Sequence, residues 1–172
     1  GLLAFVVPAA KPGATQLANA HFYAGNYDTA DSLNRLVLAA DRARRGAGHP
    51  AVAEDLINLG ATQFERGNYA EAEEYYRQAL AINRAWYGED HHAVAANLTM
   101  IGRVQIRALR WEDAVGALEE ALAIRERVFG PDHPNVASTV KELGTVALRR
   151  ERFEEAERHY LRANAIYRAT YG

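Results

Sequence analysis

The chain has 172 residues, of which 49% are hydrophobic and 24% charged, an ordinary composition for a soluble domain that can bury a core. The net charge is −2 and the sequence pI is about 6.3, which disfavours nucleic acid as the main partner because phosphate-binding proteins are usually basic. The chain contains no Cys, which excludes disulfides, Cys-based zinc sites and thiol catalysis.

The chain opens with an apolar N-terminal segment, residues 1–12, in which no Lys or Arg precedes Lys11. Because the chain begins with Gly1 and not Met, we expect a fragment or processed form of a longer protein. Two interpretations stay open: the segment is the tail of a secretory signal with a cleavage-like site at residues 7–9, or it docks on the first helix. It is far too short to span a bilayer. The compartment stays unknown, with the cytoplasm favoured and an exported or periplasmic location left open.

Several residue types recur at a fixed step of 42 residues. The residues that keep this step are His49, His91, His133, Gly60, Gly102, Gly144, Ala72, Ala114 and Ala156. A fixed period of this length predicts a stacked-repeat architecture, and such arrays usually hold another chain. We divide the chain into a degenerate unit, 13–48, and three full units, 49–90, 91–132 and 133–172.

Each unit is predicted to be a pair of helices. In the unit 49–90, Val52, Leu56 and Leu59 fall at helical spacing, so one face of the first helix is apolar. We expect Asp90 and Asp132 to cap the first helices that follow them. The predicted helices are 13–24, 28–45, 50–66, 70–87, 92–108, 112–128, 134–150 and 154–171.

Gly60 and its two equivalents lie inside predicted helices, where each costs up to about 1 kcal/mol relative to Ala. Their recurrence predicts that a neighbouring helix passes too close for a larger side chain. We expect the small Ala72 of the second helix to face Gly60, and likewise in the later units.

Carboxylates and Arg residues alternate along the predicted second helices. Glu73 lies near Arg77, and Glu119 and Glu120 lie near Arg125. This pattern predicts a solvated, charge-paired outer face and not a pair of catalytic carboxylates.

The histidines also invite a metal-site interpretation. His49, His91 and His133 each begin a different repeat, so they should lie too far apart to share an ion, and a structural role is predicted. The sequence contains no nucleophile elbow, phosphate loop or helix-borne metal motif. We therefore expect a protein that is not an enzyme and that needs no cofactor or metal.

The unit 49–90 contains, in order along the chain, Leu59-Gly60, Gly67-Asn68-Tyr69, Ala72, Tyr76 and Ala79-Leu80. In this order they resemble the tetratricopeptide repeat, over nearly the whole chain after about residue 13. The longer period is similar to the 42-residue variant of kinesin light chains and many bacterial proteins. The resemblance implies an all-α fold, a right-handed superhelical solenoid of antiparallel helix pairs whose first helices line a concave groove.

The resemblance also implies that an extended peptide or a helix binds in this groove. Carried over by position, the groove residues are Asn19, Tyr23, Asn58, Phe64, Glu65, Met100, Arg103, Arg107, Lys141 and Arg149. Family members that clamp a C-terminal carboxylate have Lys where this chain has Thr15, so we do not expect chaperone-tail binding. Arg103 and Arg107 share a helix face, and we hypothesise that this basic half receives Asp or Glu side chains or a free carboxylate of an acidic segment. The alternative, that these Arg residues pair with neighbouring acids or water, stays open.

The sequence therefore favours a non-catalytic scaffold that binds a protein or peptide, with no nucleic-acid partner and no membrane span. Two alternatives stay open. The chain is a regulatory or sensory module of a larger multidomain protein, or it is a self-assembly module that forms a homo-oligomer through the array ends. The second alternative draws on the apolar and aromatic side chains of the last helix, such as Leu161 and Tyr171, because a terminal repeat normally needs a polar cap.

Overall fold

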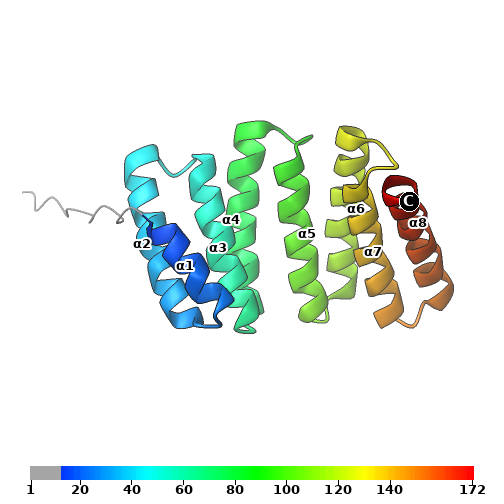
Figure 1. Ribbon diagram of the computed structural model, residues 1–172, viewed down its shortest axis with the longest axis horizontal. Coiled ribbons are helices and arrows are strands. Elements are labelled where there is room, and N and C mark those ends of the chain that lie inside the picture. The colour runs from blue at the N-terminus through cyan, green and yellow to red at the C-terminus, as the bar shows by residue number, and fades with distance from the viewer. Residues whose placement is uncertain (1–12) are drawn as a thin grey trace, which may run out of the picture. The chain divides into compact units, whose positions relative to one another are not determined.

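The computed structural model describes residues 13–172, and these residues form α-helices and turns without a β-strand. The helices are α1 (Ala14–Tyr23), α2 (Tyr27–Arg45), α3 (Pro50–Glu65), α4 (Tyr69–Tyr87), α5 (His92–Arg107), α6 (Trp111–Phe129), α7 (Pro134–Arg149) and α8 (Phe153–Tyr171). Figure 1 shows them as successive rods joined by short connections. Every helix end lies within one residue of its predicted position, so the helix predictions are confirmed. Both interpretations of the segment 1–12 lie outside the described residues.

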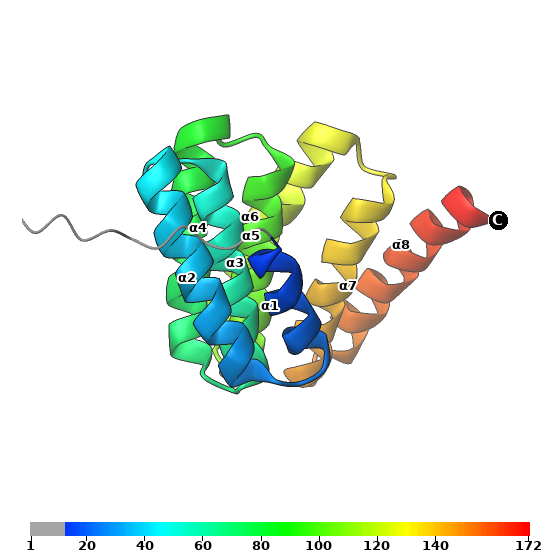
Figure 2. The same ribbon diagram turned by 60° about the vertical axis from the view of Figure 1, so that its left-hand side comes forward.

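The chain divides into two compact units, residues 1–86 and 87–172. The described part of the N-terminal unit holds α1, α2, α3 and all of α4 except its last residue. There α2 packs against both α1 and α3, and Figure 2 shows α1 and α2 as an antiparallel pair. In the C-terminal unit α6 packs against α5 and α7, and α7 packs against α8. Within residues 13–172, none of the helices combines the length and the apolar character that a bilayer crossing requires.

The core of the N-terminal unit lies between α2, α3 and α4. Leu38 of α2, Val52, Leu56 and Leu59 of α3, and Ala79 of α4 are buried in one cluster. The predicted apolar face of α3 is thus confirmed. Complete burial of a Leu or Val side chain contributes about 1.5–3 kcal/mol, so this cluster supplies most of the adhesion between the helix pairs.

In the C-terminal unit α7 is buried on two sides. Leu143 and Val146 pack against Leu118 of α6 in one cluster. Val140 packs in a second cluster with Ile166 of α8. Because α7 contributes apolar residues to both clusters, it acts as the central layer of this unit.

The glycines inside the first helices lie against large side chains of the partner helix. A Cβ atom on Gly60 would stand 2.5 Å from the Tyr76 ring, and one on Gly102 would stand 2.8 Å from Leu118. The predicted close approach is confirmed, but Ala72 is the wrong partner for Gly60. Helical side chains lean toward the helix N-terminus, so the ring of Tyr76, one turn after Ala72, reaches back to the glycine.

The recurring histidines cap the first helices of the three full repeats. The Nδ1 atom of His49 accepts a hydrogen bond from the backbone N–H of Ala51 at 3.1 Å. His91 and His133 make the same bond two residues ahead, at 3.2 and 3.1 Å. A helix start leaves several N–H groups without intrahelical partners, and each imidazole satisfies one of them. The predicted structural role of the histidines is thereby confirmed.

The expectation that Asp90 and Asp132 cap these helices is wrong. The position directly before each helix has extended backbone and belongs to the His that follows the Asp. Asp90 instead accepts two hydrogen bonds from the guanidinium group of Arg127, at 2.6 and 2.8 Å. In the same region the ring of Tyr87 stacks on the ring of His91 with centroids 4.0 Å apart, and this contact helps to hold the capping imidazole in place.

The turns between paired helices share one backbone conformation although their sequences differ. Each second helix begins with an aromatic residue, and the residue two positions before it lies in the turn. This turn residue is Gly25 or Gly67 in the N-terminal unit and Leu109 or Glu151 in the C-terminal unit. All four have positive φ, with values of 78°, 79°, 60° and 58°. The left-handed region is open to Gly and costly for other residues, so the C-terminal unit carries strain that the N-terminal unit avoids.

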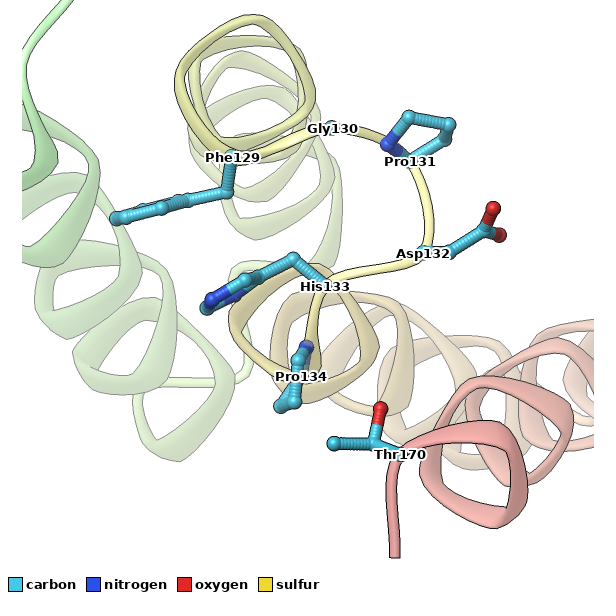
Figure 3. A pocket seen from close by; sticks show the side chains of 7 residues that line it. All are labelled: Phe129, Gly130, Pro131, Asp132, His133, Pro134 and Thr170. Atoms are coloured by element: carbon cyan, nitrogen blue, oxygen red, sulfur yellow. The ribbon is translucent and has the colours of Figure 1, made fainter.

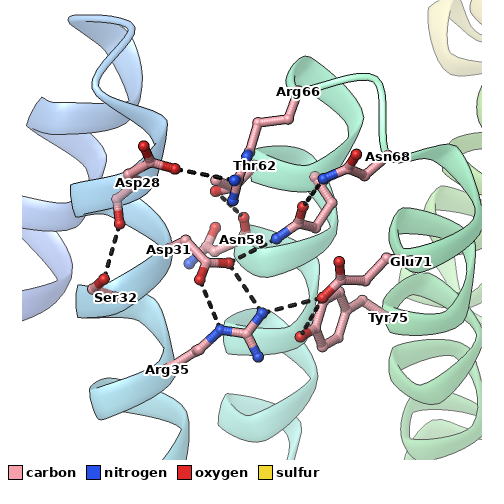
Figure 4. A network of polar contacts seen from close by, with 11 residues as sticks. Asp28, Asp31, Ser32, Arg35, Asn58, Thr62, Arg66, Asn68, Glu71 and Tyr75 are labelled. Atoms are coloured by element: carbon pink, nitrogen blue, oxygen red, sulfur yellow. Dashed lines mark hydrogen bonds and ion pairs between the residues drawn. The ribbon is translucent and has the colours of Figure 1, made fainter.

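Polar side chains fasten consecutive repeats to each other at what we call the repeat joints, where a second helix meets the next first helix. Figure 4 shows the joint of the N-terminal unit. Asp31 of α2 accepts a hydrogen bond from Gln63 of α3 at 2.8 Å and forms an ion pair with Arg35 at 2.7 Å. Arg35 also contacts Glu71 of α4 at 3.1 Å. Asp31 is the main cause of a raised pKa of Arg35, so this guanidinium group stays charged.

The joint between α6 and α7 corrects one expectation. Arg125 does not pair with Glu119 or Glu120; its Nη1 atom donates to the Thr139 hydroxyl at 2.6 Å and to the Asn135 carbonyl at 2.9 Å. Burial lowers the pKa of Arg125. The expected pairing of Glu73 with Arg77 is confirmed at 2.7 Å.

Candidate functional site: the exposed faces of the first helices

The first helices α1, α3, α5 and α7 each have a buried face and an exposed face, and the candidate residues lie on the latter. In α3, the buried face carries Leu56 and Leu59, whereas Glu54 and Glu65 are exposed and Asn58 is half-buried. This division follows from the helical period, because residues three or four apart share a face. Sequence reasoning from repeat position therefore selects side chains that a partner can reach.

In the N-terminal unit the candidate residues are polar and aromatic. Asn19 and Tyr23 of α1 are exposed, and the Tyr23 side chain is 85% accessible. On α3, Asn58 and Phe64 are half-buried and Glu65 is exposed. An exposed aromatic ring beside amide groups is the kind of surface on which protein partners find anchoring contacts.

In the C-terminal unit the candidate residues are mainly basic. Arg103 and Arg107 of α5 and Lys141 and Arg149 of α7 are exposed, and Met100 is half-buried between solvent and core. α5 and α7 are in contact, and Arg103 of α5 lies near Glu142 of α7. We call the four exposed cations the basic face.

The cations of the basic face differ in their contacts with carboxylates. The Nε atom of Arg103 lies 3.8 Å from the Glu142 carboxylate, and the two side chains are 56% and 29% exposed. Within residues 13–172, Lys141 and Arg149 form no ion pair with a carboxylate. Exposed ion pairs contribute about 0–1 kcal/mol, so the 3.8 Å contact to Glu142 holds Arg103 only weakly.

Near the second helices of the same unit, Arg side chains form ion pairs with carboxylates. Arg162 of α8 pairs with Glu126 of α6 at 2.5 Å. Arg150, just before α8, pairs with Glu112 of α6 at 2.6 Å. These charges pair between elements of the unit, whereas Lys141 and Arg149 of α7 form no ion pair within residues 13–172.

A shallow hollow of about 590 Å³ lies at the α6–α7 turn and the end of α8 (Figure 3). Its lining residues are Phe129, Gly130, Pro131, Asp132, His133, Pro134 and Thr170. The Nδ1 atom of His133 is already used to cap α7, and the ring stacks on Phe129 with centroids 4.6 Å apart. The hollow therefore lies beside the residue that caps α7.

Two other features of the described residues bear on chemistry. Within residues 13–172, no three His, Asp or Glu side chains come together as metal ligands would. Asp55 of α3 is a buried carboxyl group, and its burial raises its pKa to about 7. Sequence reasoning missed Asp55, because an acidic residue on a helix is usually solvated and only its burial marks it.

The arrangement of paired helices, glycine contacts and joints defines a helical-repeat protein. A family model described as tetratricopeptide repeat matches residues 13–85, 62–127 and 106–169, and the chain belongs to the tetratricopeptide repeat family. The predicted all-α repeat fold is thereby confirmed. No curated protein matches the chain in sequence.

Solved structures support the same fold. BtubC (BKLC) from P. vanneervenii is 27% identical with a TM-score of 0.84, and the match covers 92% of this chain and 63% of that one. The chain thus spans less than two thirds of BtubC. A putative kinesin light chain from Podosopora anserina with nearly identical TPR-like repeats is 23% identical with a TM-score of 0.80, covering 92% of this chain and 75% of that one. MamA is 16% identical with a TM-score of 0.67, and the match covers 94% of this chain and 82% of that one. The resemblance to kinesin-light-chain-like repeats is confirmed.

Proposed function

We propose that this chain is a non-catalytic binding module that holds a segment of a partner protein along the exposed faces of its first helices. Tetratricopeptide repeats typically serve as scaffolds that bind proteins or peptides. The N-terminal unit offers Asn19, Tyr23 and Asn58 as polar and aromatic contacts, and the C-terminal unit offers the basic face.

The partner segment that suits the basic face is acidic. The observation that carries this proposal is the set of exposed cations on α5 and α7, among which Lys141 and Arg149 have no carboxylate partner within the described residues and Arg103 contacts Glu142 at 3.8 Å. Carboxylates of a bound segment complete these contacts, and Arg can do so with two parallel hydrogen bonds.

The test is a binding titration with fluorescent dodecapeptides, one rich in Glu and one in which every Glu is Gln. We expect the acidic peptide to bind more tightly and its affinity to fall with salt, as exposed charge contacts do. The variants Lys141→Glu/Arg149→Glu and Arg103→Glu/Arg107→Glu should each weaken binding about tenfold or more, since each replaces two attractions by two repulsions.

The matched control is Arg158→Glu/Arg168→Glu, which makes the same change of net charge on exposed positions of α8. It should leave the affinity nearly unchanged. An equal loss in this control would mean that only net charge matters, and an unchanged affinity in the first-helix variants would rule out the basic face as the site.

Self-assembly through the array ends is a second candidate function, supported by exposed apolar side chains. On α8, Leu161 is 61% and Tyr171 is 74% exposed, and α1 and α2 expose Leu17 and Leu36. Mass-resolved chromatography over a wide concentration range tests this. A mass that rises with concentration in the wild type and stays monomeric in Leu161→Glu/Tyr171→Glu supports assembly, and a constant monomer mass in the wild type refutes it.

A further inference from the structure

The joint between α2 and α3 contains a buried carboxyl group without a hydrogen-bond partner. Asp55 of α3 is only 6% exposed, and within residues 13–172 its Oδ2 atom has no partner. Burial of an ionised carboxylate is costly unless a counter-charge or hydrogen bonds compensate it, so the side chain must either find compensation or stay neutral.

The repeats show how this position is satisfied elsewhere. Two periods on, Asp41 and Asp55 correspond to Arg125 and Thr139, which form the hydrogen bond of 2.6 Å at the joint of α6 and α7. The intermediate equivalent of Asp55 is the amide Asn97. A donor therefore meets an acceptor in the C-terminal unit, whereas two carboxyl groups occupy the same two positions in the N-terminal unit.

The charges around Asp55 decide which carboxyl group takes a proton. Asp41 accepts hydrogen bonds from Arg44 at 2.6 Å and from Arg45 at 3.4 Å, so its oxygen is already supplied with donors. Glu54, next to Asp55 on α3, adds a second negative charge, and Arg45 opposes both. From α4, the uncharged Tyr75 and apolar residues pack against the adjoining core cluster. Of the two carboxyl groups, Asp55 is the one whose Oδ2 atom has no hydrogen-bond donor within residues 13–172.

We propose that a proton on Asp55 is a structural component of the α2–α3 joint, and that loss of this proton loosens the packing of the first helix pair on α3. The neutral carboxyl group can be buried like Asn97 and Thr139 at the equivalent positions. The ionised form places a negative charge in the joint beside Asp41, which disfavours the close contact of α2 with α3.

The pH dependence has a definite sign. Burial, reinforced by Asp41 and Glu54, raises the pKa of Asp55 from 3.8 to about 7 in the folded chain. Between these values the folded state holds a proton that the unfolded state has lost, so the joint weakens as the pH rises and the effect levels off above the folded pKa. The linkage of one proton changes the opening equilibrium by at most about tenfold per pH unit.

One consequence concerns the binding surface. The first helix pair carries Asn19 and Tyr23, so loosening the joint would detach part of the proposed partner-binding faces. Only this consequence rests on the proposed function, because the stability of the joint is measured on the unliganded chain. If the joint responds to pH as proposed but no peptide binds, the result counts against the proposed function and not against the role of Asp55.

The first measurement is the Cγ chemical shift of Asp55 by NMR across pH 3 to 9. A midpoint near neutrality supports the proposal, and a midpoint near 4 overturns it. The second is amide exchange of α2 from pH 5 to 8, corrected for the intrinsic exchange rate, in the wild type and in Asp55→Asn. The wild type should lose about tenfold to a hundredfold in protection relative to Asp55→Asn over this range.

Asp55→Asn is suited to the test because an amide already stands at the equivalent position 97. The matched control is Glu54→Gln, which removes the neighbouring exposed charge from the same helix and should keep most of the wild-type slope. Equal slopes in the wild type and in Asp55→Asn would overturn the proposal. If Asp55→Asn does not fold, the NMR midpoint of the wild type alone decides the question.

Discussion

The ring of Tyr76 occupies the space beside Gly60 in which a side chain at position 60 would have to stand. The nearest ring atoms are 2.5 and 2.7 Å from the site of a Cβ atom, and Tyr76 itself is buried. A methyl group there must push a rigid ring into a filled core. The close spacing of the helix pair therefore depends on the absence of a side chain at this point.

We predict that Gly60→Ala destabilises the chain by about 1–3 kcal/mol, the usual cost of overpacking, despite the better helix propensity of Ala. The control is Gly116→Ala in α6, where no atom lies within 4 Å of the added Cβ. This variant should stabilise by up to about 1 kcal/mol. Urea denaturation of both variants measures the difference, and a stabilised Gly60→Ala would contradict the packing argument.

The left-handed turn residues give a prediction of opposite sign. Leu109 and Glu151 have φ of 60° and 58° where Gly67 has 79°. Leu109→Gly and Glu151→Gly should each stabilise by about 0.5–1 kcal/mol, because Gly relieves the left-handed strain but costs some chain entropy. The reciprocal change, Gly67→Leu, should destabilise by a similar amount. Thermal unfolding of the three variants tests this, and a uniform loss of stability would show that the turns are not strained.

The capping residue His91 should make the chain sensitive to acid. Burial, and then the neighbouring His92, lower the pKa of His91, and its Nδ1 atom must be unprotonated to accept from Ala93. A lowered folded pKa means that this contribution is present above the ordinary value of 6.5 and is lost as the pH falls through it toward the folded value.

We therefore expect His91→Ala to cost about 1 kcal/mol at pH 8 and less at pH 5, because the imidazole of the unfolded chain then gains a proton that the folded cap disfavours. His91→Asn retains a side-chain oxygen as acceptor and should keep its stability at both values. Denaturation at the two pH values compares the three chains. A constant cost of His91→Ala from pH 8 to pH 5 would show that the imidazole proton plays no part in the cap.

The joint between α6 and α7 can be measured by a double-mutant cycle. Arg125→Met removes the donor and Thr139→Val removes the acceptor of the 2.6 Å hydrogen bond. We expect a coupling free energy of about 1–2 kcal/mol, as for a hydrogen bond with one charged partner. Additive effects of the two substitutions would mean that Arg125 acts mainly through the Asn135 carbonyl.

The fold was predictable from the sequence because it depends on periodicity. The spacing of Val52, Leu56 and Leu59 fixes a buried face, and repetition at 42 residues extends the argument to the later units. The errors concern side-chain partners. Asp90 is a good capping residue by type, but the helix begins one residue too late for it, and His91 takes the position.

Contacts between repeats were the least predictable from the sequence. The partner of Arg125 lies 14 residues ahead in the next repeat, whereas charge patterning within one helix suggested Glu119 or Glu120. The candidate binding residues, such as Lys141 and Arg149, were selected by repeat position, and their exposure follows from the same helical period. Which partner they meet depends on side chains that the period does not constrain.

The joints have a consequence for how such chains can be copied and rebuilt. The pairs 41/55 and 125/139 each straddle the His that begins a repeat, so neither joint belongs to a single repeat. A gene duplication that copies one repeat unit copies one side of each of two joints. Each copied side then faces a residue that is not its original partner. The unit that can be transferred intact is therefore a second helix together with the first helix that follows it, and a designer who cuts at the histidines would separate Arg125 from Thr139.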